Sequence, residues 1–329
     1  VMGHFKGRSN DRDNRIVFPK GNTARAKVLE GRIQALPKDI CSTVSDICSL
    51  NLINNFKERK PLGKVYVDPA LKTLLVPFSQ RSASKALKTY VRGSRIPMEK
   101  CNTVRAFLHW KENDERCDID LSAVLLREDW SRITHISFYN LRDCNMCCYH
   151  SGDFVSASDE GASEFIDIDI AKAKAAGVRY VAFTVYSYSG QAYKDLPECF
   201  MGWMARQYPK SGEVFEPATV QNKIDLSADT RTALPMIFDL ETNEFIWCDL
   251  SITSSVGFGY SVENTQKDLS MICKGIVNMS KPNLYDLFAL HARARGNLVD
   301  NRDEADAVFA VDSGTCTPMD IEKIMSEYL

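Results

Sequence analysis

The chain has 329 residues, which is long enough for two or three domains, and 44% of them are hydrophobic, enough to build a sizeable core. No apolar run approaches the roughly 20 residues that a membrane-spanning helix needs, and the polar, basic start differs from a signal peptide. The formal charge of −2 hides an asymmetry, because residues 1–100 carry 20 Lys and Arg against 8 Asp and Glu. The rest of the chain is acidic, so we expect the two parts to dock or the basic part to bind an acidic partner.

The first hundred residues are expected to form a basic region that mixes helix and strand. Residues 1 to about 25 have few apolar groups and many polar ones, a composition that predicts a mobile arm. Residues 39–56 place most of their apolar side chains on one side of a helix, and the Lys-Pro-Leu-Gly sequence at 60–63 ends it. Residues 64–68 have the composition of a short strand.

A basic stripe follows, in which five cations recur at steps of 4, 3, 4 and 3 residues. They are Arg81, Lys85, Lys88, Arg92 and Arg95. Such spacing predicts one face of a helix, and a row of cations can neutralise the phosphates of a nucleic acid or another polyanion. The alternatives are a solvated helix face or one that docks on the acidic part of the chain.

Carboxylates gather between residues 117 and 169. The run at 117–126 alternates at its start, so Asp118 and Asp120 share one side of a strand while Ile119 and Leu121 share the other. A second run at 132–139 leads to a loop of small and acidic residues, and its acids are Asp153, Asp159, Glu160 and Glu164. Calcium takes six to eight oxygen ligands, so a flexible acidic loop that faces an acidic strand could bind it. Alternatively, the loop acids are simply solvated.

Cysteines are the other metal ligands to consider, since residues 144–150 contain C-x-x-C with a histidine nearby. A structural zinc site usually needs two spaced pairs, and the chain has no second C-x-x-C. Buried free thiols are therefore the better interpretation. Eleven cysteines, an odd number scattered over the chain, indicate reduced thiols and a cytoplasmic location.

The remaining chain continues with strands and then changes to helical periodicity. Runs at 196–206, 220–226, 234–240 and 245–250 predict strands, the last two forming a hairpin. Small residues at 251–261 predict a linker. Helices are expected at three places, which are 263–279, 280–296 and a last segment that starts at Thr317 with Asp320 in a capping box.

Several of these motifs resemble, in the same order, those of the TerD family of tellurium-resistance and stress-response proteins. The D-I-D-L-S run at 118–122 is similar to its F-D-L-D-A-S strand, residues 138–140 to its F-Y-N, and residues 150–153 to its H-[ST]-G-D. Residues 166–170 resemble its I-D-L strand and residues 179–185 its central I-V-F-A-V-T strand. The similarity covers about residues 100 to 258, and several collinear motifs are more specific than any one of them.

This resemblance implies a calcium-binding antiparallel β-sandwich with ligands from the D-x-D strand and the acidic loop. Family members carry G-D-G-D-D-E in that loop, whereas Ala162 and Ser163 stand here where two aspartates are expected. Fewer carboxylates should weaken calcium binding, and one site is expected rather than two. The ligand candidates are Asp118, Asp120, Asp153, Glu160 and Glu164, with Asp159 as a shifted substitute.

The sequence thus predicts a mainly β protein in three regions. Residues 1–97 form the basic N-terminal region, 98–258 the TerD-like sandwich and 259–329 a C-terminal helical region. The chain lacks G-x-S-x-G, G-x-x-x-x-G-K-[ST] and H-E-x-x-H, so a non-enzymatic role is expected. By resemblance, it is a calcium-binding stress-response protein of the tellurium-resistance type, a scaffold or sensor in an assembly with other proteins. The alternative is a polyanion-binding or nucleic-acid-binding module that uses the basic stripe.

Overall fold

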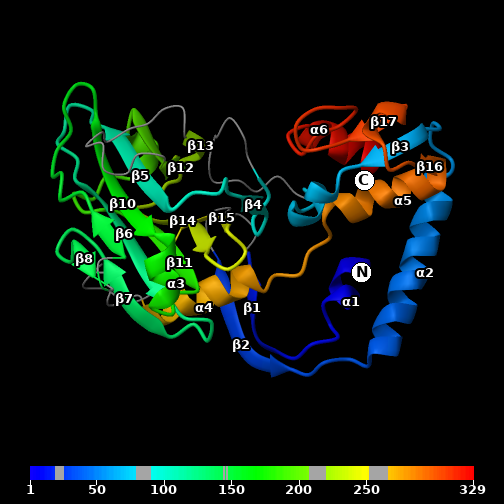
Figure 1. The fold of residues 1–329 in the computed structure, drawn as a ribbon, viewed down its shortest axis with the longest axis horizontal. Helices are drawn as coiled ribbons and strands as arrows, with labels where there is room; N and C mark the ends of the chain where they lie inside the picture. Colours follow the sequence, from blue (N-terminus) through cyan, green and yellow to red (C-terminus); the bar gives the residue numbers. More distant parts are fainter. Residues whose placement is uncertain (19–25, 79–89, 144, 146, 207–219, 252–265) are drawn as a thin grey trace. The chain divides into compact units, whose positions relative to one another are not determined.

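Two compact units make up the chain in the computed structural model (Figure 1). The structure describes residues 1–18, 26–78, 90–143, 145, 147–206, 220–251 and 266–329. Unit 1 combines both ends of the chain and comprises Val1–Arg15, Leu29–Gln80 and Asn278–Leu329. Unit 2 comprises Ile16–Val28 and Arg81–Val277. Unit 1 thus combines parts of the expected N-terminal and C-terminal regions, while residues 16–28, 81–97 and 259–277 of these regions fall in unit 2.

Unit 2 contains two antiparallel sheets of six strands each. The first sheet has the order β4 (Arg95–Pro97), β15 (Glu244–Ser251), β14 (Thr232–Asp239), β11 (Tyr180–Ser187), β6 (Ile119–Leu126) and β7 (Arg132–Ile136). The second has the order β13 (Val220–Asp225), β12 (Glu198–Arg206), β5 (Thr103–Lys111), β10 (Ala162–Asp169), β9 (Cys148–His150) and β8 (Arg142–Asp143). The predicted antiparallel β-sandwich is confirmed.

One hydrophobic core lies between these sheets, because alternate residues of their strands point inward. Strand β10 alternates strictly between buried and half-buried positions along its whole length. Three fully buried tryptophans, Trp110, Trp203 and Trp247, come from different strands, and the ring of Trp203 stacks on Phe245 at 4.2 Å. Burying each such aromatic side chain contributes on the order of 1.5–3 kcal/mol.

Helix α4 (Gln266–Val277) confirms the helical periodicity expected after residue 263, but it belongs to unit 2. Its buried side chains are Leu269, Ile272, Cys273 and Ile276, which recur at helical spacing. Gly275 of the same helix lies against Ile16, where a Cβ would come within 3.1 Å of the Cβ of Ile16. A short helix, α3 (Ile170–Ala175), begins after Asp169, whose side chain accepts a hydrogen bond from the Lys172 N–H and caps the helix.

Unit 1 has a small parallel sheet in the order β16 (Gly296–Leu298), β3 (Gly63–Val67) and β17 (Ala307–Phe309). The predicted helices α2 (Lys38–Phe56) and α5 (Leu284–Arg295) are present. Phe288 stacks on Phe309 at 4.2 Å, and the His291 ring stacks on Phe56 at 3.8 Å. The strand expected after residue 63 is therefore the centre of a sheet whose two other strands come from the far end of the chain.

Residues 1–18, the described part of the predicted mobile arm, contain a helix and a strand. Helix α1 (Met2–Lys6) packs Gly3 against Pro282, and Lys6 forms an ion pair of 2.7 Å with Asp286. Strand β1 (Arg12–Val17) pairs with β2 (Lys27–Ile33). The segment thus contacts residues far along the chain despite its polar composition, and local composition cannot reveal such contacts.

The last predicted helix also differs, since α6 (Ile321–Lys323) begins after Asp320, which is a later start than Thr317. The predicted contact between Thr317 and Asp320 is present, since the Thr317 N–H donates to the Asp320 carboxylate at 2.7 Å, but it lies in a turn before the helix. The remaining short elements are η1 (Pro69–Thr73), η2 (Tyr193–Asp195), η4 (Arg302–Glu304) and η5 (Ile324–Tyr328). Among the helices of the described ranges, none has the length and apolar character needed to span a membrane.

Candidate metal site

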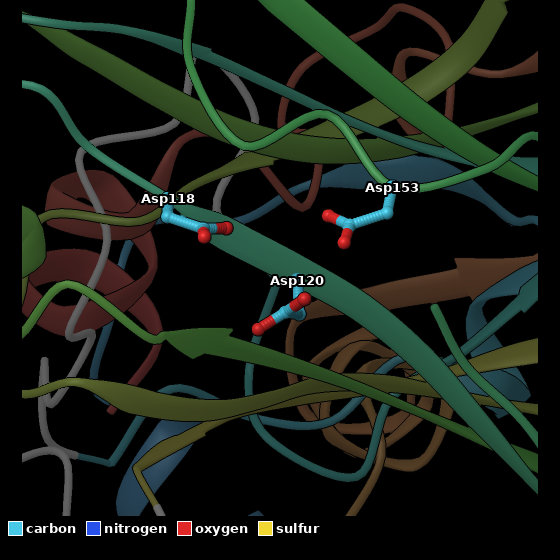
Figure 2. A group of neighbouring side chains, drawn as sticks. All are labelled: Asp118, Asp120 and Asp153. Atoms are coloured by element: carbon cyan, nitrogen blue, oxygen red, sulfur yellow. The ribbon is translucent and has the colours of Figure 1, made fainter. Parts of the chain in front are cut away.

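Three aspartates converge beside the N-terminal end of strand β6. Asp118 directly precedes strand β6, Asp120 lies in the strand, and Asp153 comes from the loop between β9 and β10 (Figure 2). One carboxylate oxygen from each residue lies within 4.8 Å of the others. Ile119 and Leu121 point into the core, so the alternation predicted from sequence is what places the first two aspartates on one face.

Asp120 is the most constrained member of this cluster. Its side chain is only 6% exposed, and within the described residues its carboxylate has no hydrogen-bond or ion-pair partner. Burial, followed by the nearby charges of Asp118 and Asp153, raises the pKa of Asp120 to about 7. Burial and Asp153 also raise the pKa of Asp118, while Arg116 acts in the opposite direction. Like charges brought this close favour either protonation or a bound cation.

Glu164, a predicted ligand, lies on the inward face of β10 and is fully buried. Its Oε2 accepts a hydrogen bond from the Leu121 N–H at 2.8 Å, and its Oε1 accepts one from the Phe154 N–H at 3.1 Å. Burial raises its pKa to about 8, although both backbone hydrogen bonds oppose this shift. The carboxylate therefore joins strand β6 to the loop, and the three-aspartate cluster does not include it.

His150 makes the complementary contacts. Its Nε2 lies 2.9 Å from the Leu121 carbonyl oxygen and must donate, because a carbonyl only accepts. Its Nδ1 accepts a hydrogen bond from the Gly152 N–H at 3.1 Å, so the ring is the neutral Nε2–H tautomer. Burial accordingly lowers the pKa of His150. The H-S-G-D motif contains this histidine, but the sequence does not predict its hydrogen bonds to Leu121 and Gly152.

Glu112 is a residue of this site that sequence reasoning missed. Its Oε1 accepts hydrogen bonds from the Cys117 N–H at 3.0 Å and from the Ala157 N–H at 2.6 Å. It thus joins the lead-in of β6 to the same loop that carries Asp153. No motif or spacing marks Glu112, because its partners lie 5 and 45 residues away.

Asp159 and Glu160 lie elsewhere, in an exposed turn that is closed by a hydrogen bond from the Gly161 N–H to the Ser158 carbonyl oxygen at 2.8 Å. Neither contributes to the three-aspartate cluster. Of the two positions where aspartates were expected, Ala162 is buried opposite Trp110, and the Ser163 hydroxyl lies 2.9 Å from His109 Nδ1. Both positions are occupied by contacts within the sheet.

The donor set of the cluster is made of carboxylate oxygens alone, which suits a hard cation such as calcium. Comparison with known proteins addresses the same part of the chain. Residues 88–206 match the family model of the TerD domain. The resemblance inferred from the motifs is confirmed for this segment, which carries Asp118, Asp120 and Asp153.

A curated relative, the tellurium resistance protein TerZ of Serratia marcescens, is 31% identical over 87 residues. This alignment covers 26% of the present chain and 45% of the relative, so the chain spans less than half the length of the curated relative that it matches. The similarity is therefore one between domains. In the structure, strands β13, β14 and β15 extend the two sheets beyond the end of the TerD match at residue 206.

The C-terminal end of the basic stripe, Arg92 and Arg95, lies within the TerD match and does not form the predicted helix. Arg95 belongs to strand β4, and Arg92 is buried in the turn before it, so the predicted helical face does not extend to these residues. The Arg92 guanidinium donates to the Asp249 carbonyl oxygen at 3.0 Å and lies 3.7 Å from the Asp249 carboxylate. Arg81, Lys85 and Lys88 lie outside the described residues.

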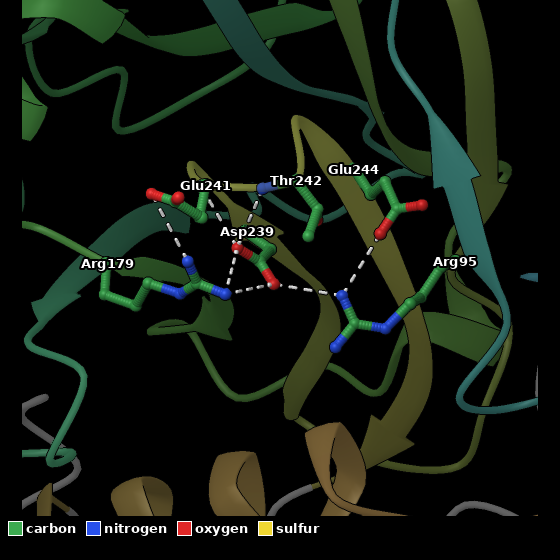
Figure 3. A network of polar contacts seen from close by, with 6 residues as sticks. All are labelled: Arg95, Arg179, Asp239, Glu241, Thr242 and Glu244. Atoms are coloured by element: carbon green, nitrogen blue, oxygen red, sulfur yellow. Dashed lines mark hydrogen bonds and ion pairs between the residues drawn. The ribbon is translucent and has the colours of Figure 1, made fainter.

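Arg95 belongs to an internal network around Asp239, which is fully buried (Figure 3). Its Nη1 lies 3.0 Å from Asp239 and 3.2 Å from Glu244, and Arg179 approaches Asp239 at 3.2 Å from the other side. Asp239 also accepts the backbone N–H groups of Glu241 and Thr242. These cations hold β4, β11 and the hairpin between β14 and β15 together, and they are not available as a polyanion-binding row.

Proposed function

We propose that this chain is a non-enzymatic, calcium-binding stress-response protein of the tellurium-resistance type. It would act as a scaffold or sensor in a cytoplasmic assembly with other proteins. Two findings support the proposal. The first is the match of residues 88–206 to the TerD domain, together with the similarity to a tellurium resistance protein. The second is the acidic cluster at the edge of the sandwich.

The observation that carries the calcium proposal is the buried carboxylate of Asp120. A charged carboxylate that loses water without gaining a partner costs several kcal/mol, and two further carboxylates nearby increase that cost. A divalent cation among the three would offset both terms. Calcium accepts irregular sets of oxygen ligands, whereas magnesium demands a nearly octahedral set, so calcium suits ligands from one strand and one loop better.

Asp118, Asp120 and Asp153 would hold the ion, which would screen their mutual repulsion and join the loop to β6. Three carboxylates are a modest charge count, so we expect weaker binding than in family members with a fuller acidic loop. A sensor needs a site whose occupancy follows the calcium concentration, and weaker binding suits that need. Neutralisation of the three carboxylates on binding would change the charge of the surface that the domain offers to other proteins.

Calorimetric titration of calcium into the chelator-stripped full chain tests this proposal. We expect one bound calcium per chain, lost in the double variant Asp118→Asn plus Asp120→Asn and retained in Asp114→Asn, which removes an exposed charge near the same strand. Magnesium should compete poorly. Absence of calcium binding at millimolar concentration, or equal binding by the double variant, would contradict a site at this cluster.

A further inference from the structure

The strand lead-in and the acidic loop that carry the three aspartates are joined mainly by side chains. Glu164 links residue 121 to residue 154, and Glu112 links residue 117 to residue 157. In each case one carboxylate accepts an N–H from both segments. Arg116 adds a third link, since its Nε donates to the Val155 carbonyl oxygen at 2.8 Å. We call Glu112 and Glu164 the carboxylate clamps.

The two clamps bracket the aspartates in the sequence. Asp118 and Asp120 lie between positions 117 and 121, and Asp153 directly precedes the clamped residue Phe154. Gly152, before Asp153, has φ of +114°, a conformation that favours glycine, and its N–H is held by His150. The backbone on both sides of the cluster is thus fixed by residues that do not belong to it.

Glu164 and His150 together also form the hydrogen bonds that an adjacent strand would make with the edge of β6. Strand β7 pairs only with residues 123–126, so it ends before Leu121. At Leu121 the carboxylate of Glu164 accepts the N–H and the ring of His150 donates to the carbonyl, which are the two bonds an adjacent strand would make. The edge of β6 next to Asp120 is therefore ordered without a strand to cover it.

From these contacts we propose that Glu164, Glu112 and His150 are positioning residues of the cation site, which set its affinity without touching the ion. The inference rests on the proposed function. Each clamp carboxylate already accepts two backbone N–H groups, and His150 uses both ring nitrogens. Asp118 and Asp153 repel one another, so an unclamped loop would move away from the strand. The clamps hold the ligands together before the cation arrives, which lowers the cost of ordering them on binding.

The test compares calcium affinity among single variants of the full chain. Glu164→Gln keeps the shape of its side chain but has only one oxygen, so it cannot accept both N–H groups that Glu164 accepts with two. Glu112→Met removes the single Oε1 that accepts both of its N–H groups. Loss of a residue that orients metal ligands typically weakens binding about 10-fold to 100-fold, and we expect this for both variants. Glu115→Gln is the matched control, because it removes the same charge from an exposed position nearby. It should stay within about twofold of wild type, since screening weakens exposed charges.

A second readout separates positioning from direct ligation. Terbium can replace calcium, and its luminescence lifetimes in H2O and D2O count the water molecules bound to the ion. If Glu164 positions the aspartates, saturated Glu164→Gln should bind terbium with the same number of waters as wild type. One or two additional waters would make Glu164 a ligand and overturn the inference. Amide exchange at Leu121 and Phe154 should accelerate in Glu164→Gln, whereas unchanged protection would contradict the clamp.

The outcomes distinguish the two proposals. If wild type binds calcium and both clamp variants bind equally well, the positioning role is wrong while the proposed function stands. If wild type does not bind calcium, both are wrong. Should Glu164→Gln fail to fold because Glu164 is fully buried, the variant Glu112→Met at the half-buried Glu112 decides the question by the same affinity and water-count measurements.

Discussion

His150 Nε2 and Glu164 Oε2 lie 3.6 Å apart with both side chains almost fully buried, yet they do not form a simple ion pair. The histidine is neutral because Nε2 donates to the Leu121 carbonyl and Nδ1 accepts from the Gly152 N–H. The two residues meet because both bind the backbone of Leu121. They lie close together because the N–H and the carbonyl oxygen of Leu121, at the buried edge of β6, each need a hydrogen-bond partner.

Calcium affinity should rise with pH up to about 7. The ion binds the deprotonated carboxylate, and the pKa of Asp120 is raised to about 7, so a proton must leave whenever calcium binds below that pH. The apparent affinity should fall by up to about tenfold per pH unit below 7. Titrations at pH 6, 7 and 8 in buffers of different ionisation enthalpy measure both the affinity and the released protons. An affinity that is constant over this range would contradict the raised pKa.

In the presence of a chelator, Asp120→Asn should be more stable than wild type. A carboxyl whose pKa is raised on folding stabilises the folded state below its unfolded pKa, and this stability is lost as pH rises through the folded value. The difference in unfolding free energy should therefore widen from pH 4 to about 7 and stay constant above. Denaturant titrations in chelator measure it. Saturating calcium should stabilise wild type and leave the variant unchanged.

Glu160→Gln and Asp159→Asn should change calcium affinity by no more than about twofold. Both side chains are exposed and lie outside the aspartate cluster, so only a screened charge is removed. The titration used for the aspartate variants measures the effect. A tenfold or larger loss in either variant would mean that the turn between Ser158 and Gly161 rearranges to bring these acids to the ion.

Asp239→Ala should destabilise unit 2 by about 3–5 kcal/mol. Asp239 is fully buried between Arg95 and Arg179, and its removal leaves those cations without their shared partner. Glu241→Ala is the matched control, because the Glu241 side chain is 70% exposed and forms an ion pair with the outer side of Arg179 at 3.5 Å. That variant should lose less than about 1 kcal/mol. Chemical denaturation compares the two, and similar losses would contradict a structural role for this network.

The polyanion alternative now depends on Arg81, Lys85 and Lys88, since Arg92 and Arg95 are committed to internal ion pairs. It predicts salt-dependent binding of nucleic acid that disappears when these three residues are changed to Glu. Fluorescence anisotropy with labelled single-stranded and double-stranded oligonucleotides at several salt concentrations measures this. Binding that is unaffected by the triple charge reversal would exclude the basic stripe as the site.

Periodicity predicted much of the fold, because α2, α4, α5 and the strands of the sandwich have strong local patterns. It failed where the decisive contacts join distant residues. The 4-3-4-3 spacing of the basic residues suggested one helix, but Arg95 belongs to a strand and pairs with Asp239, 144 residues away. No local pattern can reveal such a partner.

The aspartate cluster could be predicted only in part. Alternation placed Asp118 and Asp120 on one face, and the acidic loop supplied Asp153 as one of four candidates. The inward direction of Glu164 was available from its parity with Ile166 and Ile168, two apolar residues that face the core in β10. Its matching to the acids of the family loop concealed that signal. No signal in the sequence marks Glu112, because its hydrogen bonds form only once the strand and the loop are adjacent.

The discontinuity of unit 1 imposes an order on biosynthesis. Strand β3 leaves the ribosome early, but its parallel partners β16 and β17 follow only after the sandwich has been translated. The gap of roughly 230 residues takes about 11–46 s at usual elongation rates. During that interval the apolar surfaces of α2 and β3 lack their partners from the end of the chain, and unit 2 can fold first. A nascent chain stalled in this interval would be the form most dependent on chaperones.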